Sequence, residues 1–174
     1  MVTIRFENST DFAAREVLLN RAFGVKRSRK TSEKLRAGRL PAEGLAFSAV
    51  NEKGKLIGTV RLWNVIAGSA GPALLLGPLA VDDKARGQGV GASLMQHALA
   101  ACAKLGHGAV LLVGDAPYYS RFGFAESMAR SLHLPGPVES ARFLGLELVE
   151  GALDGAEGLV AASGRMVEAE KKAA

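Results

Sequence analysis

The stretch VDDKARGQGVGASLMQHALAACAKLG, residues 81–106, places three glycines on alternate positions directly before a run of helix formers. These are Gly87, Gly89 and Gly91. Glycine weakens a helix and adds nothing to a core, so this arrangement indicates a loop whose backbone must approach another group closely. The N-terminus of a helix presents unpaired N–H groups and the positive end of the helix dipole. The stretch therefore predicts an anion site at the start of a helix.

The segments on either side of this loop and helix predict buried strands. Residues 73–81, ALLLGPLAV, are apolar apart from Gly77-Pro78, an interruption that indicates a bulge or a strand that parts from its neighbour. The helix is expected to run to about Lys104, and residues 109–115, AVLLVGD, form a second apolar strand. Two apolar strands joined by a helix predict a parallel pair that the helix covers. The residues expected on the buried helix face are Leu94, Ala98, Ala101 and Leu105.

The remainder of the chain predicts further strands and helices in one domain that spans residues 1–174. Before the glycine loop these are a strand over Val2–Phe6, a helix from Ser9 or Thr10 to about Phe23, a partly helical stretch from Thr31, and a hairpin with its turn at Asn51–Lys55. After it they are a short helix and turn at 117–124 and a strand at 141–149. Weak strand character follows from Glu157, before a charged, frayed end.

Composition and charge narrow the class of protein. The content of hydrophobic residues is 48%, the sequence has no apolar run long enough to span a membrane, and the N-terminus lacks a signal-peptide pattern. With a single cysteine, Cys102, these features predict a cytoplasmic protein without membrane association. Of the net charge of +5, residues 26–39 (the basic segment) contribute most, with seven cations and one acid. No aromatic residue accompanies these cations, so an anionic small ligand or a solvated face is favoured over nucleic acid.

Three interpretations of the glycine loop compete. It can be a flexible turn, which leaves its position before a helix unexplained. Gly87, Gly89 and Ala92 also satisfy the G-x-G-x-x-A pattern of dinucleotide-binding folds. In those folds the glycines follow their strand almost immediately, whereas here residues 82–86 lie between the strand and the glycines. The third interpretation is a family resemblance. Residues 86–91, RGQGVG, match the Arg/Gln-x-x-Gly-x-Gly/Ala signature of the GNAT N-acetyltransferase superfamily.

The resemblance extends over roughly residues 2–160. LGPLAVDDKARGQGVGASLM is similar to the family's bulged strand, phosphate loop and helix, and APYYSRFGF resembles its second motif. It implies an α/β fold with a splayed, mixed central sheet flanked by helices, and transfer of an acetyl or longer acyl group from acetyl-CoA to a primary amine. The resemblance does not identify the acceptor, which can be a small molecule or a peptide. It also leaves open whether the chain forms a homodimer. The residues implied to bind acetyl-CoA are Leu79, Ala80, Val81, Arg86, Gly87, Gln88, Gly89, Val90, Gly91 and Ala92.

The resemblance also implies a catalytic residue. The family commonly uses a tyrosine four residues before the glycine of its Gly-Phe turn to protonate the leaving thiolate, and Gly123-Phe124 makes Tyr119 the match. Packing with nearby phenylalanines is the alternative role of this ring. Strand 73–81 lacks the glutamate that many members use as a base, so water, Asp115 or Glu43 are the candidates. Asp115 can equally cap the turn that follows it.

Other reactive residue types have simpler interpretations. Cys102 lacks a motif partner and is expected to be a small buried residue, which favours direct transfer within a ternary complex. The three histidines lack metal-ligand spacing, so no metal site is expected. Arg61 and Trp63 share a strand face and can line the acceptor cleft, although a tryptophan at this position is more often core. A non-catalytic acyl-CoA-binding module on the same fold is the rival function.

Overall fold

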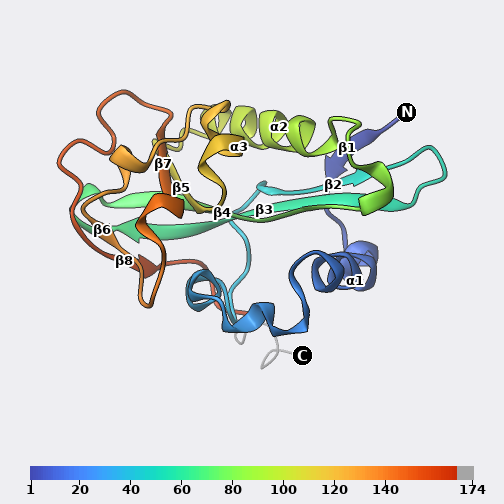
Figure 1. The fold of residues 1–174 in the computed structure, drawn as a ribbon, viewed down its shortest axis with the longest axis horizontal. Helices are drawn as coiled ribbons and strands as arrows, with labels where there is room; N and C mark the ends of the chain where they lie inside the picture. Colours follow the sequence, from blue (N-terminus) through green and yellow to red (C-terminus); the bar gives the residue numbers. More distant parts are fainter. Residues whose placement is uncertain (168–174) are drawn as a thin grey trace.

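The computed structural model describes residues 1–167 and contains the strands and helices that the sequence predicts (Figure 1). The helices are α1 (Phe12–Phe23), α2 (Val90–Lys104) and α3 (Ala116–Ser120). The strands are β1 (Thr3–Phe6), β2 (Ala46–Val50), β3 (Leu56–Ala67), β4 (Pro72–Val81), β5 (Ala109–Val113), β6 (Leu132–His133), β7 (Phe143–Glu147) and β8 (Gly158–Ala162). The weak strand expected from Glu157 is β8, whereas the charged end of the chain lies outside the described residues.

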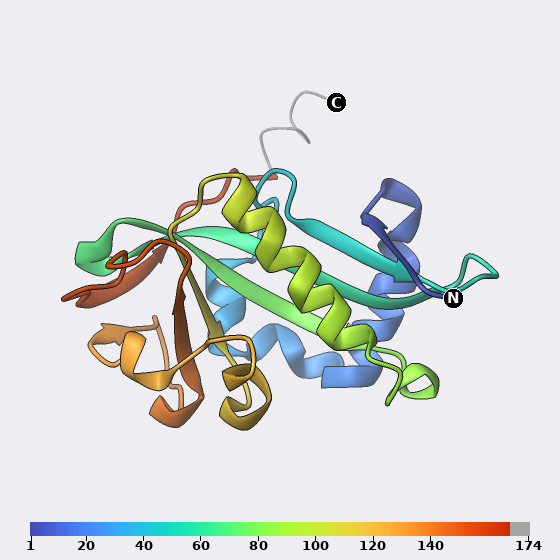
Figure 2. The ribbon, with the colours of Figure 1, turned by 90° about the horizontal axis from the view of Figure 1, so that it is seen from above.

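One mixed sheet organises the chain, in the order β1-β2-β3-β4-β5-β7, with β8 paired to β3 and β6. The predicted pair β4 and β5 is parallel, and β5 and β7 are antiparallel. Helix α2 crosses one face of the sheet, and α1 with the basic segment covers the other (Figures 1 and 2). The mixed sheet with helices on both sides is therefore confirmed.

The predicted buried face of α2 is only partly correct. Leu94 and Ala98 are fully buried, but Leu105 is 54% exposed because the helix ends at Lys104 and Leu105 is its C-cap. Met95 and Cys102 complete the buried face instead. The face that packs on the sheet is therefore rotated toward Met95, because contact with β2, β3 and β4 decides which stripe of an apolar helix is buried.

A bulge at Gly77-Pro78 splays β4 from β5, as the sequence predicts. The register against β3 pairs Val60 with Leu79 and Leu62 with Leu76, so two residues of β4 stand opposite one of β3. Within the described residues, β4 pairs with β5 only at Leu74 and Leu75. Beyond this point the edge of β4 that faces β5 is free of strand partners, so its N–H and C=O groups can pair with an extended ligand.

The buried side chain of Trp63 holds the backbone of this bulge through a hydrogen bond. Its side chain is 6% exposed, and its Nε1–H donates a hydrogen bond of 2.6 Å to the carbonyl oxygen of Gly77. The interpretation of Trp63 as a core residue is confirmed. Arg61 on the same strand pairs with Glu7 at 2.6 Å rather than facing a cleft.

We predict that Trp63→Phe, which keeps an aromatic ring but removes the N–H, lowers the free energy of unfolding by about 1–3 kcal/mol, because the Gly77 carbonyl loses its buried donor. Urea unfolding followed by circular dichroism measures this difference. Ile66→Val on the same strand, where the side chain is 37% exposed, is the control and should cost much less. A loss below about 0.5 kcal/mol for Trp63→Phe would contradict the structural role of this hydrogen bond.

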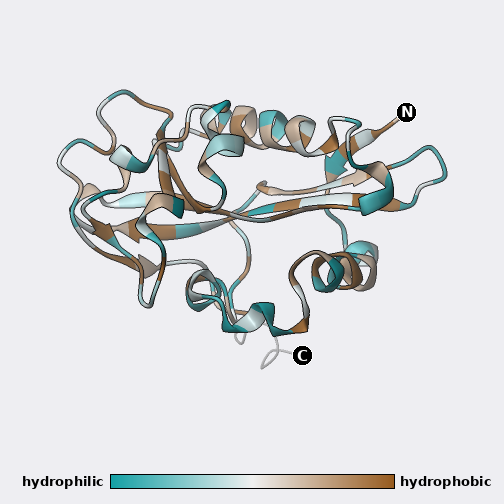
Figure 3. Cartoon of the chain, in the orientation of Figure 1, coloured by the Kyte–Doolittle hydropathy of each residue, from teal (hydrophilic) through white to brown (hydrophobic). Residues whose placement is uncertain are grey.

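The basic segment lies beneath the open end of the sheet. Two short 3-10 helices form here: Thr31–Leu35 is the partly helical stretch predicted from Thr31, and Val25–Arg29 is an additional one. Thr31 Oγ1 donates to the Pro137 carbonyl at 2.6 Å, and Lys34 Nζ donates to the Pro135 carbonyl at 3.0 Å. Figure 3 shows this part of the chain as largely hydrophilic. These contacts join the segment to the 135–138 loop, more than 100 residues later in the chain.

Candidate functional site

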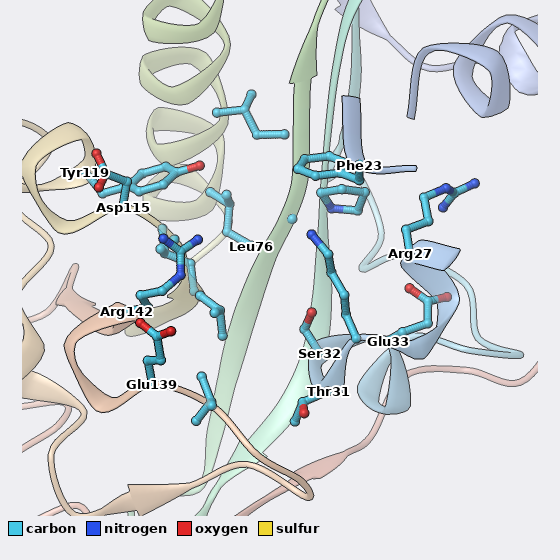
Figure 4. Close-up of a pocket in the computed structure, with 18 of the residues that line it drawn as sticks. Phe23, Arg27, Thr31, Ser32, Glu33, Leu76, Asp115, Tyr119, Glu139 and Arg142 are labelled. Carbon is cyan, nitrogen blue, oxygen red and sulfur yellow. The ribbon is translucent and has the colours of Figure 1, made fainter. Parts of the chain in front are cut away.

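A cavity of about 880 Å³ opens where β4 and β5 separate. Its walls come from β4, the ends of β5 and α3, the basic segment and the 137–142 loop. In Figure 4, Asp115, Tyr119 and Arg142 lie on one side of this space, and Phe23, Arg27 and Ser32 lie on the other. The cavity reaches Arg86 at the start of the glycine loop, so it connects the predicted anion site with the predicted catalytic tyrosine.

The glycine loop has the backbone that its sequence requires. Gly87 and Gly89 have φ values of +80° and +76°, in the region that favours glycine. No described atom lies within 4 Å of the position where a Cβ would stand at either residue, so their backbone is accessible to a ligand. Gly89 is the N-cap of α2 without a side-chain cap, and Ser93 is the first residue whose N–H reaches it, at 3.0 Å. The preceding N–H groups are the unsatisfied donors of a helix N-terminus.

At Gly91, lack of space for a side chain explains the glycine, whereas at Gly87 and Gly89 the backbone conformation does. It lies within α2 and its φ is not positive, but a Cβ there would stand 2.8 Å from Tyr118 Oη. The Tyr118 ring therefore lies over the start of α2, stacked edge-on against Tyr119 with ring centroids 4.9 Å apart. Tyr118 links the glycine loop to the motif that carries Tyr119.

The other predicted cofactor-binding residues occupy different environments. Leu79 lines the cavity, whereas the Ala80 side chain is buried against α1 and Val90 is buried in the main core. Arg86 lines the cavity and forms an exposed ion pair with Asp83 at 2.9 Å. The remaining side chains, those of Val81, Gln88 and Ala92, are partly or fully exposed. For Ala80 and Val90, only the backbone is available to a ligand.

Tyr119 is positioned by close packing. Its ring lies directly over Gly114, where even a Cβ would collide with it, and stacks edge-on against Phe124 at 6.1 Å. Burial raises the pKa of its hydroxyl to about 12; Tyr118 adds to the increase, and the positive charge of Arg142 opposes it. The hydroxyl is therefore protonated at neutral pH and can donate a hydrogen bond into the cavity.

The two acids considered as bases lie in different places. Asp115 lines the cavity beside Tyr119 (Figure 4), whereas Glu43 is exposed and is not among the described residues that line it. Asp115 is the N-cap of α3, but its carboxylate makes no capping hydrogen bond; its carbonyl accepts the Tyr119 N–H at 3.0 Å. The capping role considered for this side chain is thus not the one observed.

Cys102 has the environment of a structural residue. It is fully buried in α2, and burial raises the pKa of its thiol to about 12. The thiol is therefore protonated and inaccessible, and it cannot act as an acyl carrier. Within residues 1–167, no group of three or more His, Cys, Asp and Glu residues is arranged to hold a metal ion. No helix in this part of the chain is both long and apolar enough to cross a membrane.

Sequence reasoning missed part of the cavity wall. It recognised the cations of residues 26–39 but not that Lys30 and Arg36 line the same cavity as Tyr119, and it did not single out Arg142 at all. Arg142 precedes β7 and is brought to the cavity by the antiparallel pairing of Phe143 with Val113. The only sequence signal was the density of cations in the basic segment, because pairing between distant strands leaves no local pattern.

Comparisons with known proteins agree with this arrangement. Residues 43–126 match the model of the acetyltransferase (GNAT) domain. The chain is 34% identical over 158 residues to the uncharacterized N-acetyltransferase YhbS of Escherichia coli K12, covering 90% of this chain and 93% of that protein.

Two solved structures extend the similarity to three dimensions. The crystal structure of Escherichia coli YhbS in complex with CoA has a TM-score of 0.78 and 32% identity, over 93% of this chain and 89% of that one. A GNAT family acetyltransferase from Brucella melitensis in complex with acetyl-CoA has a TM-score of 0.68 and 28% identity, over 94% and 96% of the two chains. The splayed sheet, the glycine loop and these similarities together show that the chain is an acetyltransferase and belongs to the GNAT superfamily of N-acetyltransferases.

Proposed function

We propose that the protein transfers an acetyl group from acetyl-CoA directly to a primary amine within a ternary complex. The observation that carries this proposal is that Arg86 at the start of the glycine loop, the free edge of β4 and Tyr119 line one cavity. A cofactor extended along β4 would place its thioester where the strand parts from β5, next to Tyr119. The acceptor would then enter between the basic segment and Arg142.

The chain's groups fit acetyl-CoA in chemistry and in order. The backbone N–H groups at residues 87–92 would hold the pyrophosphate at the N-terminus of α2. The edge of β4 from Leu79 to Val81 would pair with the amides of the pantetheine arm, as an added strand does. Similar proteins from Escherichia coli and Brucella melitensis bind CoA and acetyl-CoA, respectively, which supports this assignment.

Tyr119 would donate a proton to the leaving thiolate. In the transfer, the amine nitrogen bonds to the acetyl carbon, the carbon–sulfur bond breaks, and the sulfur gains a proton while the nitrogen loses one. A protonated hydroxyl facing the open end of β4 can donate to the sulfur as its negative charge develops. Asp115 lines the same cavity and is the candidate to accept the amine proton through water. Because Cys102 is buried, attack by the amine on the thioester itself is the step that these residues support.

Screening primary amines with acetyl-CoA, while following both free thiol and acetylated product, tests this function. We expect thiol release that depends on an amine and matches product formation one to one. Binding of acetyl-CoA without turnover of any amine would favour the rival, a non-catalytic binding module. A reaction without amine measures background hydrolysis, and it must be slow for the assay to discriminate.

The pH dependence follows from the raised pKa of Tyr119. A donor with a pKa of about 12 stays protonated throughout the working range, so kcat/KM should increase with pH as the acceptor amine loses its proton. No decrease assignable to the tyrosine is expected below about pH 10. A pH–rate profile with an amine of known pKa measures this, and an alkaline limb between about pH 8 and 9 that disappears in Tyr119→Phe would contradict it.

A further inference from the structure

The cavity is lined by more positively than negatively charged side chains. Six cations and three carboxylates line the cavity. The cations are Arg27, Arg29, Lys30, Arg36, Arg86 and Arg142, and the carboxylates are Glu33, Asp115 and Glu139. A concave site with an excess of one sign of charge attracts ligands of the opposite sign more strongly than an open surface does.

Only some of the cations that line the cavity are paired with a carboxylate. Arg27 pairs with Glu16 at 2.8 Å, and Arg86 pairs with Asp83 at 2.9 Å. For Lys30 and Arg142, by contrast, no carboxylate within residues 1–167 lies within 4.0 Å. The Lys30 ammonium lies 4.4 Å from the centre of the Phe23 ring instead, a contact that positions it without neutralising it.

Arg36 is the buried member of the group. It is 9% exposed, and its Nε lies 3.3 Å from Glu33 in a geometry that leaves this buried N–H without a hydrogen-bond acceptor. Its Nη1 lies 3.1 Å from the position of a Cβ at Gly77, so the guanidinium lies next to the bulge of β4. Its Nη2 donates a hydrogen bond to Ser32 Oγ at 3.1 Å, and its positive charge adds to the electrostatic potential of the cavity that it lines.

These cations lie close enough to act on one another. Burial lowers the pKa of Lys30, and the positive charges of Arg36 and Arg142 lower it further. Arg36 and Lys30 come from the basic segment, and Arg142 comes from the opposite wall, beside Tyr119 (Figure 4). An anion between the two walls would relieve this repulsion and receive charge-assisted hydrogen bonds from both.

Building on the proposed function, we propose that the acceptor is a primary amine that also carries a carboxylate or a phosphate, and that Lys30, Arg36 and Arg142 bind this anionic group. The phosphates of acetyl-CoA have their own donors at the N-terminus of α2, which leaves the cluster free for the second substrate. Arg142 and Tyr119 share one wall, so an anion at the cluster would direct the amine of a short acceptor toward the thioester. This assigns acceptor selection to the basic segment together with Arg142.

Matched pairs of acceptors test the proposal. β-Alanine is compared with β-alaninamide, and O-phosphoethanolamine with ethanolamine, with kcat/KM expressed per free amine at the assay pH. We expect the anionic member of at least one pair to be preferred at least tenfold, and the variant Lys30→Gln/Arg142→Gln to remove that preference mainly through KM. Lys26→Gln is the control, because Lys26 belongs to the same segment but does not line the cavity. Equal use of both members of each pair, or a preference that survives in the double variant, overturns the proposal.

A binding measurement separates this inference from the proposed function. Inorganic phosphate is titrated by calorimetry into protein saturated with CoA, so that the glycine loop is already occupied. We expect phosphate affinity to decrease at least tenfold in the double variant and to be unchanged in Lys26→Gln. If no amine is acetylated but this difference is found, the proposed function fails while the anion site stands. Phosphate affinity that is the same in wild type and double variant, or a loss of acetyl-CoA affinity in its place, overturns the site.

Discussion

Replacing Tyr119 by phenylalanine is expected to lower kcat roughly a hundred-fold while acetyl-CoA affinity changes little. The substitution removes only the hydroxyl that faces the open end of β4. The ring stays packed over Gly114 and beside Phe124, so the fold around the site should persist. A hundred-fold effect corresponds to about 2.7 kcal/mol of lost transition-state stabilisation, which is within the range of a single proton or hydrogen-bond donor.

Tyr118→Phe is the matched control for this prediction. It removes the same group from the adjacent residue, whose hydroxyl lies near Gly91 at the start of α2. We expect a mild effect on kcat in this variant. The measurement is steady-state kinetics at saturating substrates, with single-turnover experiments to show that chemistry limits the rate. If Tyr119→Phe retains the wild-type kcat under those conditions, the tyrosine has only a packing role.

Gly89→Glu is expected to weaken acetyl-CoA binding at least about tenfold, or 1.4 kcal/mol for each factor of ten. The substitution puts a carboxylate on the loop that would hold the pyrophosphate, so repulsion adds to the steric block. It also costs backbone strain, because Gly89 has a φ of +76°. Calorimetric titration of acetyl-CoA into the folded variant measures the loss.

The chain supplies a control for that strain. Gly54, in the β2–β3 turn, has a φ of +77° and likewise has no described atom within 4 Å of its Cβ position. Gly54→Glu therefore imposes a comparable backbone cost and the same charge, away from the cavity. We expect it to reduce the free energy of unfolding like Gly89→Glu, and to leave acetyl-CoA affinity unchanged. Equal affinities of the two variants would reject the glycine loop as the cofactor site.

The sequence predicted the features that depend on near neighbours in the chain. Alternating glycines before α2 predicted a loop whose backbone, rather than its side chains, approaches a ligand, and the structure gives Gly87 and Gly89 the positive φ that glycine adopts without strain. Gly77-Pro78 predicted the bulge of β4, since proline cannot donate to a strand partner. Two apolar segments joined by a helix predicted the parallel pair of β4 and β5. Each of these conclusions rests on steric or hydrogen-bonding limits that act within a few residues.

Only the tertiary structure decided which distant residues face one another. The antiparallel pairing of β5 with β7 places Arg142 beside Tyr119, and the hydrogen bonds from Thr31 and Lys34 to the 135–138 loop place Lys30 and Arg36 across from them. The exposure of Leu105 likewise depends on where α2 ends over the sheet. Strand pairing and packing select among many arrangements whose local sequences are equally acceptable, so the identity of the loop follows from the sequence, whereas the charge opposite Tyr119 follows from the fold.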